Sequence, residues 1–272
     1  MSRVATVALS TRDMSSLILR YRKILVAITR VELAKRYAGS VFGMFWVILN
    51  PALLLFIYLF IYLVVFRVRF PGLSSFEYVL FVFAGLVPYL GFMEATTTGT
   101  LAIKQNIHLV KNVMLPIELI PVRVVLVSMV SQFVSMGVLL MLITFNGYLS
   151  LHIFWLPLVV ILQIMMLIGL VWVLSSVAMV LPDVGYFLNL AVLFLMFVSP
   201  IGYKPEMVPD GLEFMIYLNP ISYMVQMYRD SMLYGQWPNP FVAFVYVVMC
   251  VGCFVLGGTF FRKFKDVLVD YE

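Results

Sequence analysis

Residues 124–182 read VVLVSMVSQFVSMGVLLMLITFNGYLSLHIFWLPLVVILQIMMLIGLVWVLSSVAMVLP, and this stretch decides the fold. It lies between Arg123 and Asp183 and contains 59 residues without an Asp, Glu, Lys or Arg. A helix needs about 20 apolar residues to cross a hydrocarbon core of roughly 30 Å, so the stretch is too long for one span. The turn signal Asn146-Gly147-Tyr148 divides it into two predicted spans, near 122–145 and 153–180.

The composition of the whole chain agrees with a membrane protein. Of the 272 residues, 64% are apolar and 11% charged, and the mean hydropathy is +1.07. Soluble domains contain roughly 45–50% apolar and about 25% charged residues, so soluble globular folds and disorder are excluded. Cys250 and Cys253 share an uncharged stretch without a nearby His, so we interpret them as small apolar fillers and predict no metal site.

Other runs without charges predict the remaining spans. A run of 30 such residues separates Arg36 from Arg67, and another apolar run is interrupted only by Glu94. The predicted additional spans are 42–66, 78–101, 184–200 and 241–261. The expected fold is therefore an all-α integral membrane protein with six transmembrane helices in one domain, 1–272.

The distribution of basic residues orients these six helices. On one side of the membrane the predicted loops and termini carry 14 of the 18 Lys and Arg residues, and the other side carries four. The positive-inside rule then places both termini in the cytoplasm. The net charge of +5 is explained by topology, so nucleic-acid binding is not predicted.

The N-terminal segment 12–36 has the pattern of an amphipathic helix on the cytoplasmic face of the membrane. Its apolar side contains Leu17, Tyr21, Ile24, Ile28 and Val31, and its basic side Arg12, Arg20, Lys23 and Arg30. Two interpretations remain open. The helix is a lipid-facing anchor, or it also contacts a cytosolic partner.

The cytoplasmic stretch 102–123 is longer than a connection between two antiparallel helices requires. It mixes basic and apolar residues and contains Pro116 and Pro121. We therefore expect a docking element rather than an idle loop, and His108 is expected to be a surface contact rather than a metal ligand.

The external stretch 201–240 contains apolar pieces too short to cross the membrane. Residues 214–228 are uncharged but are broken by Asn219-Pro220, and 15 helical residues cover only about 22 Å. Two short helices that dip in from the outer face and return fit this pattern. Irregular backbone at membrane depth is tolerated only against protein or water, so the stretch is expected to border a pathway.

No motif for catalysis is present. The sequence lacks a phosphate-binding Gly-x-x-x-x-Gly-Lys-Ser/Thr loop, a His-Glu-x-x-His zinc motif and a Gly-x-Ser-x-Gly nucleophile elbow. Transport powered by a separate subunit is therefore favoured over two alternatives. These are a membrane-embedded enzyme acting on polyprenyl lipids, and a secondary transporter with inverted repeats.

Glu94 is the acidic residue that lies clearly inside a predicted span, and four threonines follow it at 96–98 and 100. Such a carboxylate should face the bundle interior or a wet cavity, although it could instead form a bond between helices. Gln132, Gln163 and Asn189 are expected to form interhelical hydrogen bonds.

Aromatic side chains are concentrated in the first predicted span. Phe42, Trp46, Phe56 and Phe60 share one stripe, while Tyr58 and Tyr62 lie on another face. Sugars stack on aromatic rings, so these side chains could line a glycan conduit. Packing or lipid contact is the alternative.

Several motifs together resemble the permease subunits of ABC type-2 exporters, in particular those for O-antigen, capsule or teichoic-acid polysaccharides. Lys35-Arg36-Tyr37-Ala38-Gly39-Ser40-Val41-Phe42-Gly43-Met44-Phe45-Trp46, followed by Asn50-Pro51, resembles the family's approach to its first span, with Phe42 in place of an expected Leu. Lys111-Asn112-Val113-Met114-Leu115-Pro116 resembles its coupling segment.

The resemblance continues to the C-terminus and covers about residues 20–266. Pro182-Asp183-Val184 with Ser199-Pro200-Ile201 resembles the fifth span, although Pro182 occupies a usually basic position. Asn219-Pro220-Ile221 through Tyr228-Arg229-Asp230 resembles the second re-entrant element, and Phe261-Arg262-Lys263-Phe264 the tail.

The resemblance implies a transport subunit without catalytic residues or cofactors of its own. Two copies would form a homodimer around a conduit in the bacterial inner membrane, among membrane lipids, and two cytosolic ATPase subunits would bind ATP and Mg²⁺. The substrate would be an undecaprenyl-linked glycan, with teichoic acid, a drug or a glycolipid as alternatives.

The resemblance and the patterns above assign four groups of residues. The interface helix, 12–36, presents Arg20, Lys23 and Arg30. The ATPase-coupling segment, 104–116, contains Asn106, His108, Lys111, Met114, Leu115 and Pro116. Substrate access and the conduit involve Arg30, Lys35, Arg36, Trp46, Tyr58, Tyr62 and Glu94. The external gate, within 201–240, contains Asn219, Pro220, Tyr223 and Arg229.

Overall fold

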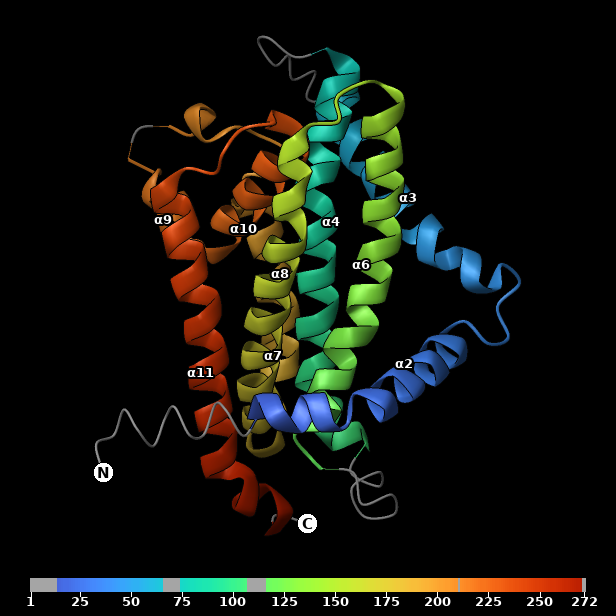
Figure 1. The fold of residues 1–272 in the computed structure, drawn as a ribbon, viewed down its shortest axis with the longest axis vertical. Coiled ribbons are helices and arrows are strands. Elements are labelled where there is room, and N and C mark those ends of the chain that lie inside the picture. Colours follow the sequence, from blue (N-terminus) through green and yellow to red (C-terminus); the bar gives the residue numbers. More distant parts are fainter. Residues whose placement is uncertain (1–13, 66–73, 107–115, 210, 271–272) are drawn as a thin grey trace.

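The computed structural model describes residues 14–65, 74–106, 116–209 and 211–270, and this part of the chain is helical with no strand. Four of its helices are long and apolar enough to cross a membrane, and they stand side by side (Figure 1). The first two are α4 (Ser75–Thr100) and α6 (Leu119–Phe145). The third covers Leu151–Val180 and consists of a 3-10 turn followed by α7 (Leu156–Val180). The fourth is Pro240–Lys265, which is part of α11 (Pro240–Asp270). Four of the six predicted spans are thereby confirmed.

The first and fifth predicted spans are shorter apolar helices in the described part of the chain, Gly43–Ile57 and Val184–Val198. The first begins with a 3-10 turn, continues as α3 (Trp46–Leu59) and passes into a π-helix, Phe60–Val65. The second, α8 (Val184–Val198), ends because Ser199 is extended before Pro200. Fifteen residues rise about 22 Å, less than the hydrocarbon core, so six spans remain a prediction.

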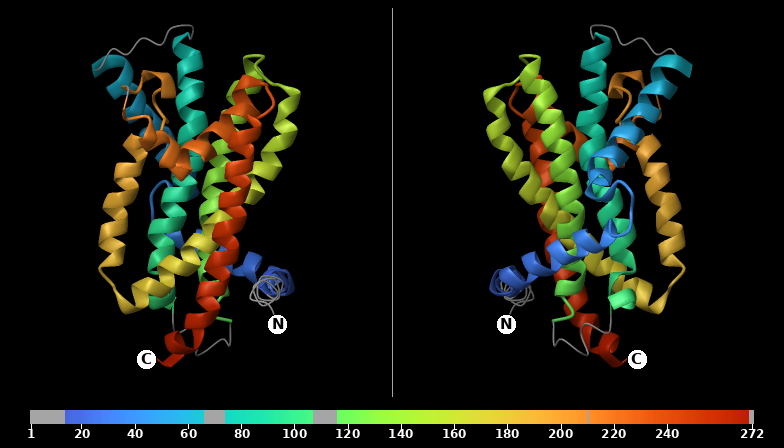
Figure 2. Two further views of the ribbon diagram at one scale, coloured as in Figure 1. Left: turned by 90° about the vertical axis from the view of Figure 1, so that its left-hand side faces the viewer. Right: turned by 90° about the vertical axis from the view of Figure 1, so that its right-hand side faces the viewer.

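Helix α4 is the centre of the bundle. A capping box begins it, because Glu77 N donates to Ser74 Oγ and Ser74 N donates to Glu77 Oε2. Most of its length is buried, and it packs against α6, α7, α8 and α10. Figure 2 shows α4 between α8 on one side and the pair of α7 and α11 on the other. Side chains on α4 therefore reach several helices at once.

Helices α7 and α11 cross with their backbones in contact. A Cβ on Gly169 would lie 2.1 Å from Cys253 O, and a Cβ on Gly257 would lie 2.1 Å from Gly169 O. Small residues at such a crossing allow membrane helices to approach closely. Cys250 is buried in the same helix, which agrees with its interpretation as a small apolar filler.

The predicted turn between the third and fourth spans is present. Gly147 has a φ of +73°, and Gly147 N and Tyr148 N donate to carbonyls in the last turn of α6. Tyr148 OH donates to Glu77 Oε1 over 3.3 Å, which joins this turn to the start of α4. This end of the bundle, the upper end in Figure 1, is the predicted external side.

The N-terminal helix lies obliquely across the lower end of the bundle (Figure 1). Residues 14–20 are helical, Tyr21 forms a turn, and α2 (Arg22–Arg36) follows, so the predicted single helix 12–36 is interrupted. Leu25, Thr29 and Leu33 are buried as α2 packs on α6. Ile24 and Val31, predicted on the apolar side, are exposed because they flank the stripe that meets α6.

The predicted external region folds into short helices at the upper end. They are α9 (Phe214–Leu218), α10 (Pro220–Arg229) and a π-helix, Asp230–Tyr234. The break predicted at Asn219-Pro220 is confirmed, because Asn219 Oδ1 accepts from Ile221 N over 2.9 Å and Pro220 is the first residue of α10. Helix α10 packs against α4 and α11. Entry of these helices into the membrane remains a prediction.

Candidate functional site

A cavity of about 380 Å³ opens where the end of α2 meets α3, α4 and α6, and we call it the lower cavity. Ligand sites in proteins fall in a range of roughly 300–1,000 Å³. The walls bring together three of the predicted access and conduit residues, Arg36, Trp46 and Glu94. The other lining residues are Tyr37, Val47, Asn50, Pro51, Leu54, Leu90, Gly91, Met93, Thr97, Thr98, Ser131, Gln132 and Ser135.

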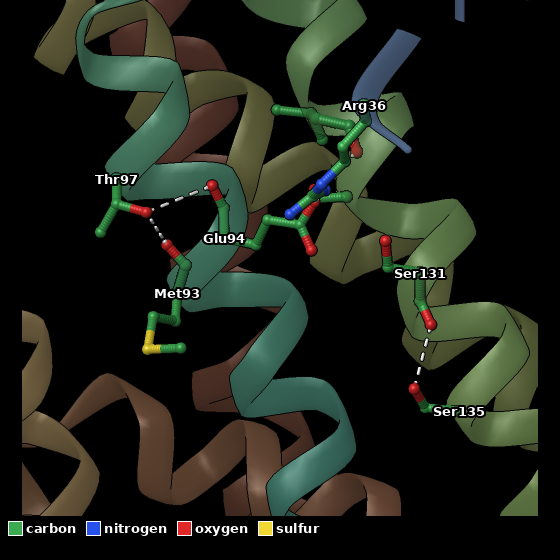
Figure 3. Close-up of polar contacts among 8 residues, drawn as sticks. Arg36, Met93, Glu94, Thr97, Ser131 and Ser135 are labelled. Carbon is green, nitrogen blue, oxygen red and sulfur yellow. Dashed lines mark hydrogen bonds and ion pairs between the residues drawn. The ribbon is translucent and has the colours of Figure 1, made fainter. Parts of the chain in front are cut away.

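Arg36 and Glu94 form an ion pair at this cavity. Figure 3 shows the Arg36 side chain directed from α2 towards Glu94 on α4. Their side chains are 39% and 20% exposed. Burial lowers the pKa of Arg36, but the charge of Glu94 and its hydrogen bond outweigh burial and raise this pKa, so the guanidinium stays charged. Glu94 thus faces a cavity, and its partner comes from the interface helix rather than from another span.

Small hydroxyl side chains cover the opposite walls. Thr97 Oγ1 on α4 donates to Met93 O over 2.8 Å, and Ser135 Oγ on α6 donates to Ser131 O over 3.0 Å (Figure 3). Ser131 Oγ differs, because it is buried without a hydrogen-bond partner among the described residues. A buried polar atom usually has a partner. The unpaired Ser131 hydroxyl is therefore available to a ligand or to water in the cavity.

The aromatic stripe of the first predicted span divides into two parts. Trp46 lines the cavity, and its Nε1 donates to Ser40 Oγ over 2.8 Å. Phe42 packs edge-on against Trp46, and Phe56 and Phe60 stack on each other with exposed side chains outside the cavity. Tyr58 and Tyr62 lie in α3 and the π-helix that follows it, but their side chains fall outside the described part of the structure.

Gln132 connects the lower cavity to a hydrogen-bonded cluster inside the bundle. Gln132 Nε2 donates to Gln163 Oε1 over 2.8 Å and to Tyr228 OH over 2.9 Å, and Gln163 Nε2 donates to Pro88 O over 3.1 Å. The interhelical bonds predicted for the two glutamines are thereby confirmed. The one predicted for Asn189 is not observed among the described residues, because its side chain is exposed on α8. The cluster joins α4, α6, α7 and α10, so several helices hold the Gln132 side chain in place. The Arg36 side of the cavity is instead formed by one partly exposed ion pair.

The other predicted basic residues stay outside the lower cavity. Arg20, Lys23, Arg30 and Lys35 are all exposed on the N-terminal helices. Arg36 is therefore the cation that the structure places at this site among the described lining residues. Arg30 and Lys35 remain candidates for attracting an anion to the lower end.

Only part of the predicted coupling segment can be placed. Asn106 Nδ2 donates to Ala102 O over 2.9 Å, and Pro116 O accepts from Leu119 N at the start of α6. His108, Lys111, Met114 and Leu115 lie outside the described residues. Beside Pro116, buried Glu118 accepts from Lys265 Nζ over 2.6 Å, which connects α6 to α11 at the lower end.

The predicted gate residues lie together at the upper end. Asn219 and Pro220 begin α10, and Asn219 Nδ2 donates to Ser199 Oγ over 2.9 Å. Tyr223 OH donates to Tyr217 O over 2.9 Å. Arg229 is 1% exposed, and its guanidinium donates to Phe81 O, Pro200 O and Ile201 O, the last two over 2.7 Å. Arg229 thus fastens α10 to α4 and to the turn after α8.

Sequence reasoning missed several lining residues, namely Asn50, Ser131 and Ser135. The signal was available for the last two, because Ser131, Gln132 and Ser135 form a polar strip at helical spacing inside a mostly apolar helix. Within the described residues, no group of three or more His, Cys, Asp or Glu side chains could hold a metal ion.

Comparisons with known proteins place this geometry in context. The profile of the ABC-2 type transporter family matches residues 24–233. The O-antigen export system permease protein RfbA of Myxococcus xanthus is 26% identical over 192 residues, which are 70% of this chain and 72% of that protein. A protein of the same name from Klebsiella pneumoniae is 29% identical over 189 residues, 69% of this chain and 71% of its own.

Proposed function

Because this chain belongs to the ABC-2 type transporter family, we propose that it is the permease of an exporter for lipid-linked polysaccharide of the O-antigen class. It is a multi-pass membrane protein with a transport role. The proposed reaction moves an undecaprenyl-linked glycan from the cytoplasmic to the external leaflet of a bacterial inner membrane. The names of the relatives, which are O-antigen export permeases, support this substrate class.

The lower cavity is the observation that carries the proposal. A polyprenyl-linked glycan has a pyrophosphate between an apolar tail and a sugar chain. The cavity offers a partner for each part, since Arg36 can bind phosphate and Trp46 can pack on a sugar ring. The apolar side chains of Val47, Leu54 and Leu90 can contact the lipid tail. Arg36 is held by Glu94 across a partly exposed pair, so an arriving pyrophosphate would compete with Glu94 for the guanidinium.

The power for export would come from a partner. In this proposal two copies of the chain form a homodimer. Each copy binds one cytosolic ATPase subunit, which in turn binds ATP and Mg²⁺. The binding surface for the ATPase would be the lower end of the bundle, where α2 packs on α6 and the predicted coupling segment 104–116 connects α4 to α6. Both termini would be cytoplasmic, the chain would cross the membrane six times, and α9 and α10 would form the external gate.

Surface glycan in living cells tests the proposal. The chain, its partner ATPase and the matching glycan biosynthesis enzymes are expressed in a bacterium that lacks its own exporter. We expect surface glycan with the wild-type chain and none when the Walker lysine of the ATPase is replaced. Arg36→Gln should lower export at least tenfold, whereas Arg22→Gln should lower it little, because Arg22 is an exposed cation of the same helix outside the cavity.

Three outcomes would contradict the proposal. Surface glycan that persists without ATP hydrolysis would indicate a different transport mechanism. Turnover of a polyprenyl lipid by the purified chain alone would indicate a membrane enzyme. Export of teichoic acid or of a glycolipid instead of this glycan would retain the family but change the substrate.

A further inference from the structure

A second cavity, of about 410 Å³, lies at the upper end, and we call it the upper cavity. It is bounded by the turn after α8, a 3-10 turn (Pro205–Met207), α9, α10 and the start of α11. It shares no lining residue with the lower cavity. The side chains used below are Glu206, Glu213, Tyr217, Ser222, Tyr223 and Gln226.

Ser222 provides the first sign of a ligand. Ser222 is 7% exposed and lines the upper cavity, and its buried Oγ has no hydrogen-bond partner among the described residues. Other helical hydroxyls here donate to a carbonyl one turn back, as Ser199 does to Leu195 O and Ser231 to Tyr228 O. An unsatisfied buried hydroxyl costs free energy, so a partner from outside the chain would remove that cost.

The groups around Ser222 have the chemistry that binds a sugar ring. Tyr223 OH is engaged by Tyr217 O, which fixes the Tyr223 ring at the wall, and the Tyr217 ring is 63% exposed. Gln226 Nε2 donates to Asp230 Oδ1 over 2.9 Å, so Gln226 can offer its amide oxygen to a ligand hydroxyl. Aromatic faces attract the C–H face of a pyranose, while Ser222 and Gln226 supply hydrogen bonds.

The charges at the upper cavity restrict which sugar fits. Glu206 and Glu213 contribute two carboxylates, and no lining residue in the described part of the chain is Lys or Arg. The guanidinium of nearby Arg229 is occupied by backbone carbonyls. Carboxylates accept hydrogen bonds from hydroxyls and repel anions. A uronic acid is therefore disfavoured relative to a neutral or amino sugar.

We propose that the upper cavity is an external subsite for one neutral or amino pyranose unit of the exported glycan. This inference rests on the proposed function, because it takes the exported glycan as the ligand. A subsite beside the predicted gate would hold a sugar on the outer side and so oppose backward movement of the chain.

Binding of simple pyranosides tests the subsite. The chain and its ATPase partner are reconstituted in nanodiscs, and saturation-transfer NMR is recorded with methyl glucoside, methyl N-acetylglucosaminide and methyl glucuronide. We expect saturation of at least one of the two neutral pyranosides, and binding of the glucuronide at least fivefold weaker. Ser222→Ala and Tyr217→Ala should each weaken binding by roughly three- to tenfold, the loss for one hydrogen bond or ring contact.

The controls separate binding from folding. Leu218→Ala changes a side chain that is 77% exposed and outside the cavity, so it should leave binding unchanged. Ser222→Ala should not lower the melting temperature, because it removes an unpaired hydroxyl. Equal binding by the variants and the wild type, or no binding by the wild type, would overturn the subsite. Failure of the wild-type chain to export glycan despite pyranoside binding would instead overturn the proposed function.

Discussion

Two arginines at opposite ends of the bundle are held in different ways. Arg36 at the lower end is partly exposed and pairs with one carboxylate, that of Glu94. Arg229 at the upper end is buried and donates to three backbone carbonyls, and its guanidinium lies 3.5 Å from the centre of the Phe81 ring. The first arrangement can exchange its partner at little cost, and the second cannot, because losing Arg229 would leave buried backbone carbonyls without their donor.

The difference indicates that the contacts of Arg229 contribute more to the stability of the fold than the contact of Arg36. A partly exposed ion pair contributes at most about 1 kcal/mol to stability, so we expect that a phosphate can displace Glu94 from Arg36. Buried hydrogen bonds to a charged group contribute about 1.5–3 kcal/mol each. Arg229 was predicted at the external gate, and the structure indicates that its position there is structural.

The largest effect is expected from Arg229→Met. It leaves the carbonyls of Pro200 and Ile201 without their donor and removes the cation beside buried Asp230. We expect a loss of about 3–5 kcal/mol, seen as a fall in melting temperature on the order of 10 °C in detergent. Lys204→Met, which alters a less buried cation nearby, should change the melting temperature by less than about 2 °C. Equal stability of the two variants would contradict the structural role.

Glu94→Gln should change stability little and export strongly. The substitution keeps the shape of the side chain and removes its charge, so the free energy of unfolding should fall by at most about 1 kcal/mol. Export should fall severalfold because Arg36 is no longer held in place before substrate arrives. The exchange Arg36→Glu with Glu94→Arg restores the pair, and we expect it to restore stability without restoring export. Export by the exchanged pair would show that pairing alone matters.

The salt dependence of stability should differ between the ion pair of Arg36 and the hydrogen bonds of Arg229. Raising NaCl from about 0.05 to 0.5 M shortens the screening length from more than 10 Å to about 4 Å. The stability difference between wild type and Glu94→Gln should then disappear, whereas the deficit of Arg229→Met should persist. Melting temperatures measured across this salt range check both expectations, and parallel salt dependence of the two variants would refute the contrast.

The smallest effect is expected at the two serines of the lower cavity. Ser131→Ala removes an unpaired hydroxyl, so stability should stay the same or rise by up to about 1 kcal/mol. Ser135→Ala removes a hydrogen bond to Ser131 O and should lower stability by about 0.5 kcal/mol. Thermal unfolding of the two variants side by side measures the difference, and a larger loss for Ser131→Ala would mean that its hydroxyl has a partner.

Much of the fold could be predicted from the sequence because long apolar runs have one stable solution in a bilayer. The spans near α4, α6, α7 and α11 begin or end within a few residues of the predicted limits. The limits predicted for the other two spans, 42–66 and 184–200, also lie close to the observed helices. Apolar length alone does not decide whether these two shorter helices cross the membrane. The α-helix after Trp46 passes into a π-helix at Phe60, and α8 ends at Ser199.

The site could be predicted only in part. Arg36, Trp46 and Glu94 were assigned to access or conduit, and they do line one cavity. Their pairing joins residues 58 positions apart and depends on how α2 crosses the bundle, which residue spacing does not encode. The burial of Arg229 was equally hidden, because its acceptors are backbone carbonyls, and every residue carries a carbonyl whatever its side chain.

The contact between α7 and α11 has a mechanical consequence. Their backbones are in contact at Gly169 and Gly257 with no side chain between them, so a rotation that brought a larger side chain into this crossing would make it collide with the partner backbone. We therefore expect α7 and α11 to move as one rigid body during transport. We expect the helices that move relative to the bundle to be α3 and α8, which contact it through side chains that can change rotamer.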